Sequence, residues 1–410
     1  MSGSKWTDIV WTDLLGHAHI IRTRSDRIND VMIDASEVTR GFGGDSLANG
    51  PLRLVVDPAS EVEIPFEPGV SLVMANIHSM EGTPSPYCSR SALKNILNQI
   101  SSDGYELQAA AELEFFLIDP KTGLPIYSEI ANYSITKGSE MEPIMRRVRN
   151  ESRLMDIPIE ASNPEYSGGQ GEVNIRYGEA LRAADRATLL RVLVRLFARQ
   201  AGLDATFMAK PWTDRAGNGM HVHQSLWHKG KNVFYEAGQL SAIGRSYAAG
   251  LLEHSVEFAL FGCATPNAYH RRSDYSFAPT IVCWGEDNRT LSLRSIIGGE
   301  NSTRLEQRDA SADCNIYLTF AGQFAAGMDG VRRHLEPPEQ VQGNAYSHTE
   351  LSRLPETFLE AFDYLQASGE ALRLLPRETV IAYIDILREE RILAVTSASD
   401  WERNRYMGTV

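Results

Sequence analysis

The chain has 410 residues, 43% of them hydrophobic, and its 53 acidic residues outnumber 40 basic ones to give a formal net charge of −13. Such a chain can bury a substantial core, which predicts two domains or one large domain with an appendage. The negative charge argues against nucleic acid and against an anionic membrane surface as the main partner.

The first part of the chain, residues 1–85, is predicted to be a small β-rich domain. The apolar run 52–56 and the alternating run 62–66 indicate strands, and prolines and a glycine near them mark turns. The glycine-rich stretch 41–45 indicates a loop. Residues 81–87 contain two prolines and a glycine, which cannot continue a helix or a central strand, so this segment is the expected linker.

The remainder, residues 86–410, is predicted to form a large second domain. The spacing of apolar residues indicates, in chain order, a helix that Ser89 or Ser91 caps and Asp103-Gly104 ends, a strand over 105–118, helices over 181–201 and 243–261, and a mostly helical stretch over 350–395. Strands that alternate with long helices are typical of the α+β or α/β class.

The cysteines and the apolar runs bear on where the protein works. The four cysteines are scattered without a Cys-x-x-Cys pair (Cys88, Cys263, Cys283 and Cys314), which argues against a disulfide framework or a zinc site and fits a reducing cytosol. The chain begins without the pattern of a signal peptide, and no apolar run approaches the ~18 residues that span a bilayer. We therefore expect a cytoplasmic protein.

Two acidic motifs carry the first chemical signal. Glu112 and Glu114 alternate on one face of the predicted strand, where neighbouring carboxylates repel unless a cation lies between them. Glu165 and Glu172 flank glycines, which let the backbone approach a ligand. Each motif alone also fits a solvated edge strand or a surface loop.

A histidine pair and a set of arginines follow. His221 and His223 share one face of a predicted strand, an arrangement common in metal sites and also found in hydrogen-bonded pairs. The arginines fall in three segments with one further glutamate, and guanidinium groups bind carboxylate and phosphate bidentately; this set comprises Arg271, Arg289, Arg294, Arg304, Glu306 and Arg308.

Together these residue types satisfy the needs of phosphoryl transfer. Glutamate oxygens with a histidine suit Mg²⁺ or Mn²⁺, and arginines neutralise a carboxylate substrate and a transferred phosphoryl group. The residue types alone leave open which carboxylate is activated and what attacks it.

The same motifs, in this order, resemble the glutamine synthetase family, with a match from about residue 70 to 406. They are Glu112-x-Glu114, Gly169-Gln-Gly-Glu172, Phe207-Met-Ala-Lys-Pro211, Gly219-Met-His221-Val-His223-Gln-Ser225-Leu226, Asn267-x-Tyr-x-Arg271, Asp287-Asn-Arg289, Arg304-x-Glu306-x-Arg308 and Asn315-x-Tyr-Leu318. The closing Trp401-Glu-Arg-x-Arg-Tyr406 resembles the tail of relatives that ligate amines.

The resemblance implies an α+β fold, with a small N-terminal β-grasp domain and a large catalytic domain whose curved antiparallel sheet, flanked by helices, forms a funnel for ATP and glutamate. It implies two to three Mg²⁺ or Mn²⁺ ions per site, stacked homo-oligomeric rings (a hexamer or dodecamer), and a reaction in which ATP phosphorylates the γ-carboxylate of L-glutamate before an amine displaces phosphate.

Roles for individual residues follow from the same resemblance. Glu114, Glu165 and Glu172 would hold one metal ion, and Glu112, His221 and Glu306 a second. His223, Ser225, Arg294 and Arg304 would lie by the nucleotide, and Gly217, His221, Arg271 and Arg308 by glutamate. The catalytic set would be Glu114, Arg289, Arg294 and Arg308, in which Arg289 and Arg294 stabilise the phosphoryl group.

Departures from the family pattern bear mainly on the amine. Phe277 stands directly before Ala278-Pro279, where glutamine synthetases have a glutamate that helps to bind and deprotonate ammonium. A phenyl ring accepts no proton but packs on an alkyl or aryl group, so we expect an organic amine as acceptor. The other departures are Ala216, Asn163 and Ile316.

Further aromatic residues, Phe42 and Tyr275, hint at an apolar or aromatic amine, and Asp45 is a candidate for the N-terminal aspartate that helps to bind ammonium in the family. Three alternatives stay open: an authentic glutamine synthetase that uses ammonia, a metal-dependent hydrolase built on the His-x-His pair, and a catalytically silent relative.

Overall fold

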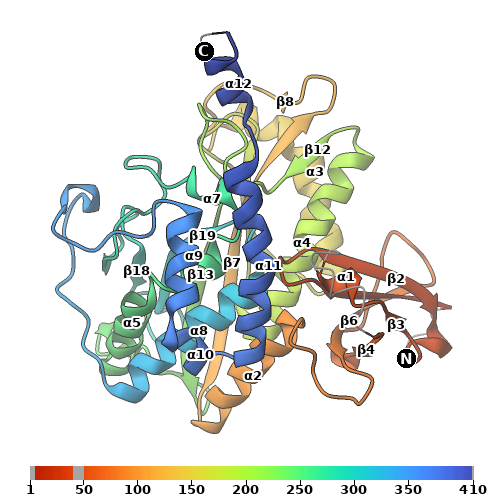
Figure 1. The fold of residues 1–410 in the computed structure, drawn as a ribbon, viewed down its shortest axis with the longest axis horizontal. Coiled ribbons are helices and arrows are strands. Elements are labelled where there is room, and N and C mark those ends of the chain that lie inside the picture. Colours follow the sequence, from red (N-terminus) through yellow and green to blue (C-terminus); the bar gives the residue numbers. More distant parts are fainter. Residues whose placement is uncertain (1–4, 40–49, 409–410) are drawn as a thin grey trace.

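The computed structural model describes residues 5–39 and 50–408, and the stretch 41–45 with Phe42 and Asp45 lies outside them. Residues 5–78 form a six-stranded sheet, which lies at the right of the molecule in Figure 1, in the order β2-β1-β6-β4-β3 with β5 against β6. Only β1 and β6 run parallel among these pairs. The strands are β1 (Trp6–Thr12), β2 (Ala18–Arg24), β3 (Met32–Ile33), β4 (Leu52–Val56), β5 (Val62–Glu63) and β6 (Val70–His78).

The prediction for this region is confirmed at β4. The predicted strand 62–66 is too long, because Pro65 lies in a turn that leads back to β6 and β5 ends at Glu63.

The second sheet has eleven strands and carries the site. Its main path is β17-β18-β19-β13-β7-β10-β9, antiparallel except for β17 and β18. These strands are β7 (Glu106–Asp119), β9 (Ile159–Pro164), β10 (Gln170–Ile175), β13 (Gly219–His228), β17 (Trp284–Glu286), β18 (Leu293–Ile296) and β19 (Arg304–Ser311).

Short strands extend this sheet or pair apart from it. β8 (Leu124–Pro125), β11 (Gly178–Glu179) and β12 (Asp204–Thr206) pair with β7, and β14 (Lys231–Asn232) pairs with β13. β15 (Tyr235–Glu236) and β16 (Gln239–Leu240) form a separate two-stranded sheet.

The central strand β7 divides the large sheet into an apolar and a polar face. Leu113, Phe115 and Leu117 are buried in the main core, against which α2 and α4 pack. Because side chains alternate along a strand, Glu112 and Glu114 project from the other face. The apolar half of β7 thus anchors a strand whose polar half faces the site.

Helices cover the apolar side, and α8 packs against both α2 and α5. Their bounds are α1 (Ser36–Thr39), α2 (Ser89–Ser102), α3 (Ile135–Leu154), α4 (Ala180–Gln200), α5 (Ala242–His254), α6 (Ala259–Gly262), α7 (Pro266–Tyr269), α8 (Ile316–Arg333), α9 (Phe358–Ala367), α10 (Gly369–Leu374), α11 (Arg377–Thr396) and α12 (Asp400–Tyr406), with 3-10 turns at Ser25–Arg27, Pro58–Ser60 and Ala345–Ser347. The α+β fold class is confirmed, and none of the helices in the described part of the chain is long and apolar enough to cross a membrane.

The predicted helices are confirmed with corrections at their ends. The cap of α2 is Cys88, whose sulfur accepts a hydrogen bond from the Ser91 amide, and not Ser89 or Ser91. α5 ends at His254 rather than at residue 261, and residues 350–357 are not helical.

A buried cation joins the N-terminal sheet to helices that pack on the large sheet. Arg90, on α2 and 2% exposed, donates to both carboxylate oxygens of Asp185 on α4, at 2.8 and 2.9 Å. It also donates to Asn76 on β6 and to Asp57, which follows β4, at 3.0 and 2.7 Å. Tyr317 on α8 donates to the same Asp185 carboxylate. One guanidinium group therefore connects four elements.

Replacing this cation tests its structural role. Arg90→Met should lower the free energy of unfolding by about 3–5 kcal/mol, because it leaves the buried carboxylate of Asp185 without its cation. Arg332→Met is the matched control, since Arg332 forms a half-exposed pair with Asp103 and such pairs contribute about 0–1 kcal/mol. Urea denaturation of both variants gives the comparison, and equal losses would contradict the assignment.

Candidate active site

Two cavities meet on the polar face of the large sheet. The larger, of about 470 Å³, and the smaller, of about 320 Å³, share Glu112, Ala161 and Asn174 as lining residues. Side chains of β7, β10, β13 and β19 line these cavities. Glu112 on β7 is therefore the point where the two cavities adjoin.

Strand register explains why distant motifs gather there. His221 on β13 lies opposite Glu112 on β7, and His223 lies opposite Glu306 on β19. On the other side of β7, Glu172 on β10 lies opposite Glu114. Directly opposed residues in antiparallel strands have Cβ atoms about 4.5–5.5 Å apart, so the pairing itself assembles the acidic and histidine motifs.

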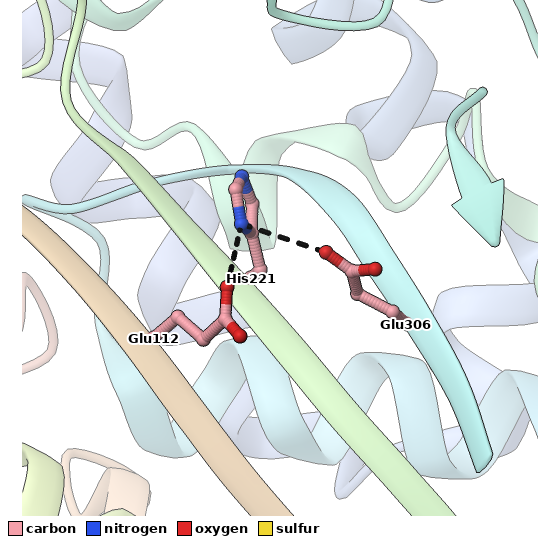
Figure 2. Close-up of side chains that lie close together, drawn as sticks. All are labelled: Glu112, His221 and Glu306. Atoms are coloured by element: carbon pink, nitrogen blue, oxygen red, sulfur yellow. Dashed lines mark hydrogen bonds and ion pairs between the residues drawn. The ribbon is translucent and has the colours of Figure 1, made fainter. Parts of the chain in front are cut away.

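Glu112, His221 and Glu306 converge on one point (Figure 2). The Nδ1 atom of His221 lies 3.1 Å from a carboxylate oxygen of Glu112 and 3.6 Å from one of Glu306. The second oxygen of Glu112 lies 2.8 Å from Nε2 of His223. Burial alone would raise the pKa of Glu112, but hydrogen bonds with both histidines hold it well below its usual range.

Glu306 is a fully buried carboxylate held by cations. It has no exposed surface, and Arg294 and Arg308 both donate to it. Burial would raise its pKa, but Arg308, followed by the two histidines and Arg294, lowers it to about 2. The two guanidinium groups thus supply positive charge at Glu306, which the family resemblance predicts to be a metal ligand.

The carboxylates on the other side of β7 lack such partners. Burial, and then the charges of Glu112, Glu114 and Glu165, raise the pKa of Glu172 to about 9. Burial and the charge of Glu114 raise the pKa of Glu165 to about 7. Among these acids only Glu114 accepts a short backbone hydrogen bond, 2.6 Å from the Gly219 amide, within the part of the chain that the structure describes. This cluster has the excess negative charge that a cation would relieve.

In these two cavities, two groups of donor atoms fit a divalent cation. Glu112, His221 and Glu306 form one and Glu114, Glu172 and His221 the other, each with ligand atoms within 4.8 Å of one another. Carboxylate oxygens with one imidazole nitrogen form a donor set suited to Mg²⁺ or Mn²⁺. The first group equals the set predicted for one ion.

The second group differs from the set predicted for the other ion. It contains His221 where Glu165 was expected. Glu165 lines the same larger cavity, and its carboxylate accepts a hydrogen bond from the Asn163 amide at 2.9 Å.

The smaller cavity collects the residues predicted to lie by the nucleotide. His223, Ser225 and Arg304 line it, while Arg294 lines the larger cavity. Arg304 Nε donates to His223 Nδ1 at 3.0 Å, so the Nε2 atom that faces Glu112 carries the proton. Tyr177 and the loop 301–303 also line this cavity, and no motif in the sequence marked them.

The larger cavity collects the residues predicted to lie by glutamate. Gly217, His221, Arg271 and Arg308 line it. The Arg271 guanidinium donates to the backbone oxygens of Ala310 and Arg308 at 2.9 and 3.1 Å, so it also fixes the end of β19. A side chain at Gly217 would place a Cβ atom 2.4 Å from Cγ of Arg271, so only glycine fits there.

An aromatic flap lies at the edge of the larger cavity. Phe277 is 62% exposed with φ 65°, and its ring centroid lies 5.1 Å from that of Tyr166. Both line the cavity, together with Tyr133 and Arg289. Tyr275 instead packs on Tyr346. Tyr166 and Tyr133 were missed in the sequence, although the position of Tyr166 directly after Glu165 was a signal.

Comparison with known proteins places this site in a family. The model of the glutamine synthetase catalytic domain matches residues 86–406. A γ-glutamylethanolamide synthetase of Streptomyces coelicolor is 34% identical over 87% of this chain and 79% of its own length. A glutamate–isopropylamine ligase of a Pseudomonas species is 31% identical over 93% of this chain and 86% of its own length.

Other matches include glutamine synthetases and a solved structure. The glutamine synthetase of Methanococcus voltae is 31% identical over 84% of this chain and 80% of its own length. A complex of GmaS with ADP superposes with a TM-score of 0.90 and 26% identity, over 99% of this chain and 97% of that one. This chain belongs to the glutamine synthetase family and is an ATP-dependent ligase that forms C–N bonds.

Proposed function

We propose that this ligase joins the γ-carboxylate of L-glutamate to an organic amine, with ATP as co-substrate and two to three Mg²⁺ or Mn²⁺ ions in each site. The proposal of an organic amine rests on Phe277, an apolar residue at the cavity edge in the position where glutamine synthetases have a glutamate. The relatives named for ethanolamide and isopropylamine ligation support the same conclusion.

The two cavities suggest how the substrates divide. ATP would occupy the smaller cavity, beside His223, Ser225 and Arg304, with its phosphates directed past Glu112. Glutamate would occupy the larger cavity, beside Gly217 and Arg308. Bound divalent cations would neutralise the phosphate oxygens and polarise the transferred group.

In the first step, a γ-carboxylate oxygen of glutamate attacks the terminal phosphorus of ATP, the bond to the bridging oxygen breaks, and ADP leaves. Arg289 and Arg294, which line the larger cavity, are suited to hold the transferred phosphoryl oxygens. Arg308 would orient the substrate carboxylate, because its hydrogen bond to the buried Glu306 holds its guanidinium group in place.

In the second step, the amine nitrogen attacks the acyl-phosphate carbon and the bond to phosphate breaks, so an amide and phosphate are released. The nitrogen enters as an ammonium ion and loses two protons to solvent in becoming the amide N–H. Phe277 can take neither proton; its ring offers contact area to the carbon body of an amine.

We propose that residues 1–85 are an N-terminal β-grasp domain and 86–410 the catalytic domain. We further propose a cytoplasmic enzyme assembled as homo-oligomeric rings, a hexamer or dodecamer.

The acceptor is tested by ADP release with ATP, Mg²⁺ and glutamate against a panel of amines that includes ammonia. We expect an organic amine to give the highest kcat/KM. Phe277→Glu should shift preference towards ammonia about tenfold or more, because a carboxylate binds ammonium and accepts its proton. Glutamate at this position adds no backbone strain beyond that of phenylalanine, since both occupy the same left-handed φ.

Phe277→Gln is the matched control, since it is polar but neither charged nor basic. It should lose apolar amines without gaining ammonia. Best turnover of the unmodified enzyme with ammonia would refute the organic acceptor, and no turnover with any amine would refute the ligase assignment to this substrate pair.

Metal binding should release protons near neutral pH. Without a cation the pKa of Glu172 is about 9, so the group is largely protonated, and a bound cation favours its carboxylate form. Metal affinity should therefore rise with pH up to about that value. Titration calorimetry of Mg²⁺ in two buffers of different ionisation enthalpy measures the release. Glu172→Gln should reduce it, and identical heats in both buffers for the unmodified protein would contradict the prediction.

A further inference from the structure

Three exposed aromatic side chains surround the outer part of the larger cavity. Tyr133, Tyr166 and Phe277 are 57%, 40% and 62% exposed and line it together. They come from three segments: the loop before α3, the loop between β9 and β10, and the flap 273–279. The Tyr166 and Phe277 rings meet at an interplanar angle of 53°. Exposed aromatic residues gathered around one cavity mark a binding surface.

Hydrogen bonds hold the backbone that carries two of these rings, those of Tyr166 and Phe277. The Tyr166 backbone oxygen accepts from the Ala131 amide at 3.3 Å. On the flap, Ser276 donates to the Arg271 backbone oxygen at 2.8 Å, and the Tyr346 hydroxyl donates to the backbone oxygen of Ala278 at 3.0 Å. Both rings therefore stand on anchored backbone, which lowers the entropy cost of holding a ligand between them.

Charge around this cavity is arranged unevenly. Among the described residues that line it, every acid belongs to the cluster at the sheet face: Glu112, Glu114, Glu165 and Glu172. The remaining charged lining residues are Arg271, Arg289, Arg294 and Arg308. Arg289 lines the cavity beside Tyr133, which places a cation next to the aromatic wall. Of these four arginines only Arg289 is exposed, so the outer part of the cavity carries one cation beside the three aromatic rings.

We propose, on the basis of the ligase activity proposed above, that the acceptor is a monoamine with a neutral carbon tail that packs between Tyr166 and Phe277. The ammonium end would point to the carboxylate cluster, since Glu165 and Tyr166 line the same cavity. A diamine of the same length would carry its second ammonium group to the aromatic wall. There an exposed ring attracts a cation only weakly, and the charge of Arg289 opposes it. Tyr166 and Phe277 are the specificity residues.

Amines that differ in chain length or in a second charge test whether the enzyme binds a neutral carbon tail. Each buried methylene should raise kcat/KM about fourfold, so butylamine should exceed methylamine by about tenfold or more when most of its tail is buried. Butylamine should exceed 1,4-diaminobutane by a similar factor. Hydroxylamine is the reference acceptor, because it has no carbon tail and its product, a hydroxamate, reports on acyl-phosphate formation.

Substitutions at the two aromatic residues test whether they cause the preference for butylamine. Tyr166→Ala and Phe277→Ala should each lower the ratio of kcat/KM for butylamine to kcat/KM for hydroxylamine about tenfold, since the lost ring removes apolar contact area that only the alkyl tail uses. Tyr364→Ala is the control, because Tyr364 on α9 is similarly exposed and lines neither cavity.

Two failures can be told apart. Hydroxamate formation without preference for butylamine over the diamine, or with preference unchanged in both variants, would overturn this inference alone. Absence of hydroxamate formation and of turnover with every amine would overturn the proposed function and the inference with it.

Discussion

The buried carboxylate of Glu306 contacts two arginines, and the rest of the cleft is arranged around this compensation of charge. Four further acids lie along the same polar sheet face. Those that have cationic or histidine partners keep their charge, as the lowered pKa values of Glu306 and Glu112 indicate. Glu165 and Glu172, which have no such cationic or histidine partner, have raised pKa values. The division separates a part of the site whose charge is balanced internally from a part that a cation would complete.

The local half of this arrangement could be read from sequence. Alternation along a strand places Glu112 and Glu114 on one face, and likewise His221 and His223. Which strands lie side by side is a long-range property: β13 pairs with β7 although more than a hundred residues separate His221 from Glu112. Spacing within a motif cannot fix that register, so only resemblance to a family could join the motifs before a structure was known.

The misses have physical reasons too. α8 was not predicted individually because its three glycines, Gly322, Gly327 and Gly330, weaken the helix signal of its sequence, although most of its residues are buried. Tyr133 carries no motif and reaches the cavity through a turn with positive φ. The hydrolase alternative for the His-x-His pair fails, because both histidines contact Glu112 within the catalytic domain of a ligase family.

The Arg90 contacts bear on how this architecture can change over evolutionary time. Its guanidinium group uses Asp57 and Asn76 from the N-terminal sheet and Asp185 from α4. A recombination event could replace the N-terminal sheet with one from a distant relative. The new sheet would have to supply matching acceptors, or the buried Arg90 would lose part of its hydrogen bonds. Exchange of this sheet between lineages is therefore constrained by a few polar atoms at the junction, even where the rest of its surface is free to diverge.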